Sequence, residues 1–155
     1  MSQISDAITT ALAQEYRDRA ANLHQWVDHL NDEQFWRNPF SFGNSIGHLV
    51  LHLTGNLNYY IGAQVAKTGY IRNRDLEFAE SRRPSKSEVL HKFDDAIGMV
   101  VATIESQTEA GWTAAYTAER ELEARDRFTI LLRCVSHLYH HVGQIIYLSR
   151  ELTRK

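Results

Sequence analysis

Apolar residues recur along most of this chain at intervals of three and four, the spacing that places them on one face of an α-helix. The first such segment, roughly residues 2–30, has its apolar face at Ile4, Ile8, Ala11, Leu12, Leu23, Trp26, Val27 and Leu30. Proline interrupts helices, and its two occurrences, Pro39 and Pro84, leave long intervals in which helices can run for many turns. The pattern therefore predicts an all-α protein whose first helix ends near Asn31 and Asp32.

The next apolar segment predicts a second helix that begins at Asn44 or Ser45, because either side chain can accept a hydrogen bond from a free N–H group of the first turn. Its apolar face is formed by Ile46, Leu49, Val50, Leu53, Leu57, Tyr60 and Ile61. The helix is expected to end before Gly69. Before it, residues 35–39 indicate a turn anchored by aromatic side chains. After it, residues 70–83 have no sustained period, which indicates a loop or a short helix.

A third helix is predicted after Ser85, which stands three residues before Glu88 in the S-x-x-E arrangement of a capping box. Its apolar face consists of Val89, Leu90, Phe93, Ile97, Val100, Val101 and Ile104. Residues 107–125 lose the helical period and predict a long connection. Asp126 can then cap a last helix over residues 127–150.

Length and composition place these helices in one globular unit. The chain has 155 residues, which fits a single domain because domains contain about 100–200 residues. Its 43% hydrophobic and 23% charged residues are typical of a globular protein and not of a disordered one. Four amphipathic helices joined by two long connections predict a four-helix bundle over residues 1–155, with a wiring other than the simplest up-and-down order.

Charge and termini exclude several classes of partner. The chain has 17 basic and 19 acidic residues and no strongly basic segment, so no nucleic-acid partner is expected. The first residues lack the basic and apolar regions of a signal peptide, and no run of about 18 apolar residues occurs, so we expect a cytoplasmic protein without a membrane contact. The one cysteine, Cys134, cannot form an internal disulfide, in agreement with a reducing compartment.

The last predicted helix carries two lines of residues. The first line is apolar and is expected to pack on a neighbouring helix: Phe128, Leu131, Leu132, Val135, Val142 and Ile146. The second has a polar centre between apolar ends: Ile130, Cys134, His137, His141, Gln144 and Leu148. Because residues four apart on a helix have Cβ atoms about 5–6 Å apart, the imidazoles of His137 and His141 can reach one metal ion. Such a pair is common by chance, and a further ligand must come from elsewhere.

The second helix offers two histidines, again one turn apart. His52 flanks the apolar face and is predicted to point inward, whereas His48 lies nearly opposite its centre and is interpreted as a solvent-facing or loosely packed side chain. The four histidines without a partner at useful spacing are interpreted as surface or hydrogen-bonded residues: His24, His29, His91 and His140.

Two segments resemble motifs of a known superfamily. They are residues 44–56, with the sequence NSIGHLVLHLTGN, and residues 137–145, with the sequence HLYHHVGQI. In order, spacing and chain length they resemble the DinB-like superfamily of four-helix bundles, which includes the YfiT-like proteins, and more narrowly an uncharacterised bacterial branch of it. The resemblance implies a metal triad at His52, His137 and His141, with His48 as either a fourth ligand or a decoy.

Three neutral imidazoles leave an open coordination position, which is typical of catalytic zinc sites and not of closed structural ones. Zinc is the metal expected first, with nickel or iron as alternatives, because imidazole suits all of them. A bound zinc ion can activate either water for hydrolysis or a thiol. Members of the resembled superfamily include transferases that use low-molecular-weight thiols, so the resemblance implies thiol activation. The sequence has no general base like the Glu of H-E-x-x-H, which favours the thiol.

Several residues keep two interpretations. Cys134 is either a soft metal ligand or, preferably, a small buried residue. Gln144 and Asn56 lie one turn from proposed ligands and either orient an imidazole or serve in capping and packing. Arg72 and three other arginines of the second connection either attract an anionic substrate or are ordinary surface charge: Arg74, Arg82 and Arg83. The competing function is a bundle with an absent or vestigial metal that acts as an interaction module, and the resemblance implies a homodimer.

Overall fold

The protein is all-helical in the part of the chain that the structure, a computed structural model, describes, which is residues 2–154. Within these residues there is no β-strand, and an isolated bridge joins Ala115 to Asp126. The helices are, in chain order, α1 (Gln3–Val27), α2 (Asp32–Trp36), α3 (Ile46–Leu57), the π-helix η1 (Asn58–Ala66), α4 (Arg74–Ala79), α5 (Lys86–Glu105), α6 (Glu109–Trp112) and α7 (Arg127–Leu152). None of the described helices is both long enough and apolar enough to cross a membrane.

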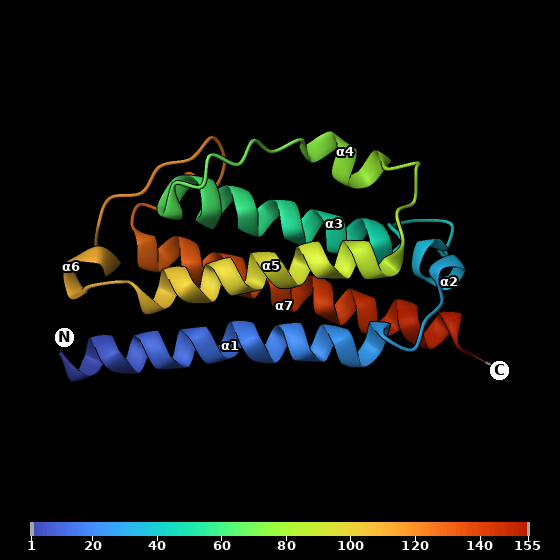
Figure 1. Cartoon of the computed structure of the whole chain (residues 1–155), viewed down its shortest axis with the longest axis horizontal. Helices are drawn as coiled ribbons and strands as arrows, with labels where there is room; N and C mark the ends of the chain where they lie inside the picture. Colours follow the sequence, from blue (N-terminus) through green and yellow to red (C-terminus); the bar gives the residue numbers. More distant parts are fainter. Residues whose placement is uncertain (1, 155) are drawn as a thin grey trace.

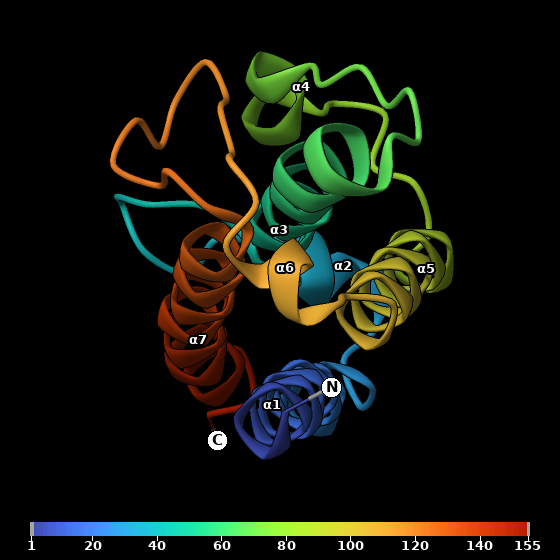
Figure 2. The same ribbon diagram turned by 90° about the vertical axis from the view of Figure 1, so that its left-hand side faces the viewer.

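Four long segments surround the apolar core, as Figure 2 shows in end view: α1, α3 with η1, α5 and α7. Helix α1 packs against α5 and α7, and α3 packs against the same two helices, so α1 and α3 occupy opposite corners. In Figure 1, α1 and α7 run in one direction while α3 and α5 run in the other. The chain between η1 and α5 therefore returns along the length of the molecule, and it carries α4 across the outer side of α3.

The long helices begin where local capping signals predict. Ser45 accepts a hydrogen bond from the N–H of His48, and Ser85 accepts one from the N–H of Glu88. Asp126 caps α7 by accepting a hydrogen bond from the N–H of Thr129 at 2.7 Å. These contacts lie within four residues of chain, so the sequence alone can specify them.

The ends and connections differ from the predictions in two places. The first helix ends at Val27 instead of near residue 31, because Asn31 caps a separate helix, α2. The side chains of Asn31 and Gln34 accept hydrogen bonds from each other's backbone N–H groups in a capping box. The short helix that follows includes Phe35 and Trp36, the first two residues of the predicted turn. The connection predicted over residues 107–125 is also interrupted by a short helix, α6.

The aromatic anchors predicted for residues 35–39 are confirmed, since Phe35 and Trp36 are buried. The Trp36 indole donates a hydrogen bond to the carbonyl of Pro84 at 2.9 Å. Its ring lies so close to α3 that a Cβ on Gly47 would meet the ring carbon Cε3 at 2.5 Å. A glycine at this position therefore allows α2 to close one end of the core.

Packing between helices overrides the apolar pattern at several positions. Ile4, Ala11 and Leu132 were assigned to inward faces, and all three are exposed. The fully buried Tyr16 instead occupies the contact between α1 and α7, where its hydroxyl donates a hydrogen bond to the carbonyl of Leu131 at 2.7 Å. Tyrosine can be buried there because its polar group has this partner.

Candidate metal centre

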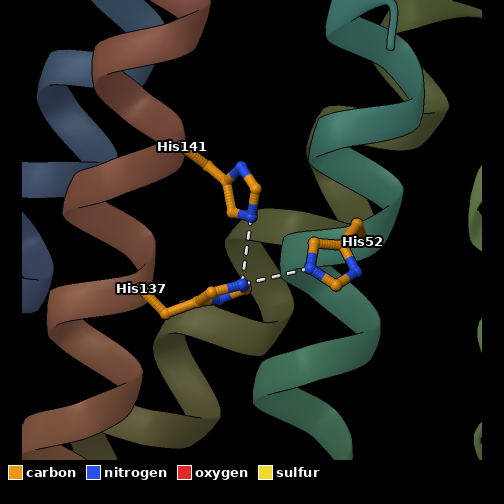
Figure 3. Close-up of side chains that lie close together, drawn as sticks. All are labelled: His52, His137 and His141. Atoms are coloured by element: carbon orange, nitrogen blue, oxygen red, sulfur yellow. Dashed lines mark hydrogen bonds between the residues drawn. The ribbon is translucent and has the colours of Figure 1, made fainter. Parts of the chain in front are cut away.

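Three histidines from two helices meet between α3 and α7, as Figure 3 shows. The Nε2 atom of His137 lies 3.1 Å from Nε2 of His52 and 3.0 Å from Nε2 of His141. One potential ligand atom from each of the three lies within 4.8 Å of the others. The predicted residues are therefore close enough to bind one metal ion.

Each histidine reaches this point for a simple geometric reason. His137 and His141 are one turn apart on α7 and share a face of that helix. His52 comes from the buried face of α3, which packs against α7. Its side chain is almost fully buried, whereas His137 and His141 are half-buried and leave the group accessible from one side.

The separation of the nitrogens fits a shared ion. Zinc binds histidine nitrogen at about 2.0–2.1 Å, so two ligands at a tetrahedral angle have nitrogens about 3.3 Å apart. The two measured separations, 3.0 and 3.1 Å, are slightly shorter than this value. Only a small outward movement of the rings would bring them to the geometry of bound zinc.

The outer nitrogens of two rings fix where the lone pairs point. Nδ1 of His52 lies 2.9 Å from a carboxylate oxygen of Glu77, and Nδ1 of His141 lies 2.6 Å from the side-chain oxygen of Gln144. Both partners accept hydrogen bonds, so both Nδ1 atoms carry the proton and both Nε2 atoms present lone pairs. His137 has one Nε2 and can donate a proton to only one of these lone pairs. A cation at the centre would satisfy all three nitrogens, so these residues fit a bound metal ion.

Burial and the neighbouring imidazoles keep the rings of His137 and His141 neutral. Burial, together with the neighbouring imidazoles of His141 and His52, lowers the pKa of His137 to about 3. Burial also lowers the pKa of His141 to about 4, and His52 adds to this effect while the hydrogen bond to Gln144 opposes it. Because a neutral imidazole is the form that binds metals, these rings are ready to act as ligands at pH 7.

Glu77 on α4 anchors the outer side of the group. Its carboxylate accepts hydrogen bonds from Nε and Nη2 of Arg72 at 2.7 and 2.9 Å, besides the bond from His52. Burial raises the pKa of Glu77, but the hydrogen bonds from His52 and Arg72 outweigh it and lower the pKa, so the carboxylate stays charged. The buried Arg72 is thus committed to Glu77 and is neither ordinary surface charge nor free to bind an anion.

In a comparison with family models, residues 3–155 match a family described as "Protein of unknown function (DUF1572)". The chain belongs to this family. A search of curated proteins found no match to this chain.

In this DUF1572 chain, Glu77 is the functional residue that the sequence did not reveal. Its place in the polar connection shows no helical period, and its partner His52 is 25 residues away. A signal for the contact did exist in α3, where Gly55 stands inside a helix, three residues after His52. A Cβ on Gly55 would lie 2.0 Å from Oε1 of Glu77, so the glycine makes room for the carboxylate.

The two residues considered as hydrogen-bond partners of ligands have different outcomes. Gln144 contacts Nδ1 of His141, which favours the first of its two interpretations. Asn56 is buried, but its side-chain oxygen has no hydrogen-bond partner among the described residues, and Glu77 contacts Nδ1 of His52 in its place. The difference arises because α4 covers this side of α3.

The structure also decides between the interpretations left open for His48 and Cys134. His48 is not loosely packed, because its ring nitrogens lie 2.7 Å from the hydroxyl of Ser45 and 3.1 Å from the carbonyl of Glu80. These contacts hold it on the α2 side of α3, and it is not part of the three-histidine group. Cys134 is buried, and burial raises the pKa of its thiol far above the ordinary value. The structure thus favours a small packed residue over a soft ligand at this position.

Proposed function

We propose that this DUF1572 chain is a metal-dependent enzyme of the DinB-like superfamily, folded as a four-helix bundle. In this proposal His52, His137 and His141 hold a divalent transition metal, with zinc first and nickel or iron as alternatives. The observation that carries the proposal is the convergence of three Nε2 atoms, two of them with lone pairs fixed by outer partners. The packing of four long helices around one core also supports it.

The proposed reaction is transfer of a low-molecular-weight thiol to an electrophilic carbon. A bound zinc ion with three histidine ligands would supply an open position and lower the pKa of a thiol or of water there. The thiol loses its proton to solvent, its sulfur forms a bond to carbon, and the leaving group departs with the electron pair of the broken bond. With water in place of the thiol, the same site performs hydrolysis.

The surroundings of Glu77 favour the thiol over water. Hydrolysis benefits from a nearby base that removes a proton from water during attack. Both oxygens of Glu77 already accept hydrogen bonds from Arg72 and His52, and the pKa of this carboxylate is lowered. Glu77 therefore holds the proton of His52 in place and is a poor base, whereas attack by a thiolate needs none.

Metal analysis tests the first step of this proposal. Protein purified without a histidine tag and loaded with zinc should retain about one ion per chain after dialysis, by analogy with other three-histidine sites. His52→Ala and His137→Ala should each lose it. His29→Ala is the matched control, because His29 is exposed and lies outside the group. A wild-type protein that retains no ion would overturn the proposal.

A substrate panel tests the second step. Zinc-loaded wild-type protein is assayed with several low-molecular-weight thiols and alkylating electrophiles, and in parallel with esters and amides. Thioether formation that is lost in His52→Ala supports the transferase, and ester or amide cleavage alone supports the hydrolase. No turnover in either panel, despite a bound ion, would contradict an enzymatic role.

The second candidate is a binding module, a helical dimer whose metal is absent or vestigial. The observation that favours it is the outer surface of α7, where Leu132 and Tyr139 are exposed although large apolar side chains are usually buried. Sedimentation velocity of the zinc-free protein measures self-association. A stable dimer without a retained ion would support this candidate, whereas a dimer that retains zinc agrees with the enzyme.

A further inference from the structure

An apolar cleft of about 640 Å³ lies directly beside the histidine group. His141 and its partner Gln144 belong to its lining, so the cleft and the candidate metal centre share a wall. The other lining residues come from α7, from the loop between α2 and α3, and from α3 at Leu49. Cavities that bind small molecules have volumes of about 300–1,000 Å³, and this cleft falls in that range.

Aromatic side chains stand around this cleft without being part of the core. Phe42 and Tyr147 are each 75% exposed, and Phe40 is half-exposed. The rings of Phe40 and Phe42 stack with centroids 5.6 Å apart and planes inclined by 14°. Beneath them, the buried Leu49 and Leu148 also line the cleft. Several exposed aromatic rings above an apolar floor indicate a surface that binds something.

The loop that presents these rings is held in shape by one side chain. The amide nitrogen of Asn38 donates hydrogen bonds to the carbonyls of Phe42 and Gly43 at 2.9 and 3.0 Å. Its amide oxygen accepts a hydrogen bond from the N–H of Phe40 at 3.0 Å. Gly43 has a φ of 74°, a left-handed conformation that suits glycine. The aromatic wall is therefore preformed, which lowers the entropy that a ligand would lose on binding.

The lining also defines the charge of a suitable ligand. Among residues 2–154, no Asp, Glu, Lys or Arg lines the cleft, and the polar groups of the lining are imidazole, amide and phenol. By contrast, the cleft on the other side of α3 is lined by charged residues that include Glu80, Arg82 and Lys92. A neutral group thus meets no charge in the apolar cleft, whereas an anionic or cationic group would lose its hydration without a partner.

We propose that this cleft binds the neutral aromatic or bulky apolar part of the substrate and places its reactive end at the histidine group. The inference rests on the proposed function, because the cleft becomes a substrate site only if His141 holds the metal that acts on that substrate. The shared wall at His141 orients the ligand, with its ring among Phe40, Phe42 and Tyr147 and its polar end toward α3 and the three imidazoles.

Binding can be tested with an inert probe and without metal. Zinc-free, ¹⁵N-labelled protein is titrated with 2-naphthalenemethanol, a neutral aromatic alcohol, and observed by NMR. The backbone amides of Gly43 and Gly143, which lie on opposite walls, should shift together and saturate. Shifts that do not saturate, or that map to other parts of the chain, would overturn the proposal.

Two variants with a matched control assign the probe to the cleft. Phe42→Ala and Tyr147→Ala should each weaken probe binding about tenfold, because each removes an aromatic contact. Both residues are largely exposed, so the variants should remain folded. Tyr139→Ala is the control, since Tyr139 is an exposed tyrosine on α7 that does not line the cleft. Equal affinities in all four proteins would contradict the assignment.

Replacing zinc with paramagnetic cobalt(II) tests whether the bound probe lies close to the metal centre. If the proposal holds, the CH₂ protons of the bound probe relax faster with the cobalt protein than with the zinc protein, and His52→Ala removes this difference.

Zinc retention without probe binding would overturn the proposed role of the cleft and leave the proposed function standing. Probe binding without any retained metal would overturn the proposed function and, with it, the substrate role. Probe binding that disappears as the protein self-associates would also overturn that role, because a second copy of the chain would then cover the cleft.

Discussion

His24 and the three-histidine group show how different surroundings give the same type of side chain two different roles. Both ring nitrogens of His24 face carboxylates, with Nδ1 2.8 Å from Asp28 and Nε2 2.7 Å from Asp94. Burial lowers the pKa of His24, but the hydrogen bonds to Asp94 and Asp28 outweigh it and raise the pKa. In the group between α3 and α7, imidazoles face one another, and the pKa values of His137 and His141 fall.

The difference shows that the partners of a histidine, together with its burial, decide which protonation form it favours. His24 favours the protonated form, in which it donates to both carboxylates and links α1 to α5 through Asp94. His137 and His141 favour the neutral form, which offers lone pairs to a cation. From the sequence, His24 was interpreted as either a surface or a hydrogen-bonded residue, and the structure confirms that it is hydrogen-bonded.

The largest expected effect is the stabilisation by zinc, which should depend on the three-histidine group and not on His24. Zinc at about 100 times its dissociation constant should stabilise the wild-type protein by about 2.7 kcal/mol, because the ion binds only the folded state. His141→Ala should abolish this stabilisation, and His24→Ala should keep it in full. Thermal unfolding with and without zinc measures both. A zinc effect that survives in His141→Ala would remove the contrast between the two regions.

The second prediction concerns the glycine that makes room for Glu77. In Gly55→Ala, the new methyl group must displace a carboxylate that His52 and Arg72 hold, at a cost of about 1–3 kcal/mol in the free energy of unfolding. Zinc affinity should also fall about 10–100-fold, the range typical for loss of a ligand's outer partner. Urea unfolding and a competitive zinc titration measure the two effects.

The control for this variant is Gly98→Ala on α5. Gly98 is an exposed helical glycine whose added Cβ would meet nothing within 4 Å. This substitution should stabilise the protein by about 0.4–1 kcal/mol, since alanine loses less backbone entropy than glycine on folding. If both variants behave alike, the contact between Gly55 and Glu77 does not constrain the site.

The third prediction uses the pH dependence of the zinc-free protein below pH 6.5. The unfolded chain, with histidine pKa values of about 6.5, binds protons that folded His137 and His141 reject, so stability falls as the pH is lowered. Each histidine should contribute a slope of at most about 1.4 kcal/mol per pH unit. Urea unfolding at pH 5.5 and 6.5 measures it. His137→Ala should flatten the dependence, whereas His29→Ala should leave it unchanged.

The smallest expected effect concerns the contribution of His24 to stability above pH 6.5. Because the folded pKa of His24 is raised, its contribution is complete below pH 6.5 and is lost as the pH rises through the folded value. His24 is partly exposed, so solvent screening limits the contribution to about 0.5 kcal/mol. His24→Gln should remove the loss of stability between pH 6.5 and 8.5. A wild-type stability that is constant over this range would contradict the charged link.

Much of the helical framework follows from local signals. Ser45, Ser85 and Asp126 cap the helices that the sequence predicts, because a cap and its partner lie within a few residues. The positions of His137 and His141 on one face of α7 follow in the same way from helix geometry. The wrong prediction at Ile4, which is exposed, and the burial of Tyr16, which the apolar pattern did not include, both concern which side of a helix another helix covers.

The sequence by itself determined the long helices, the caps at Ser45, Ser85 and Asp126, the paired imidazoles of α7 and the inward side of α3 that carries His52. Only the tertiary structure decided that His52 meets this pair and that Glu77 sets its proton on the outer nitrogen. The physical reason is that a metal site needs lone pairs from distant segments to point at one place. Their direction depends on packing and hydrogen bonds that no local pattern encodes.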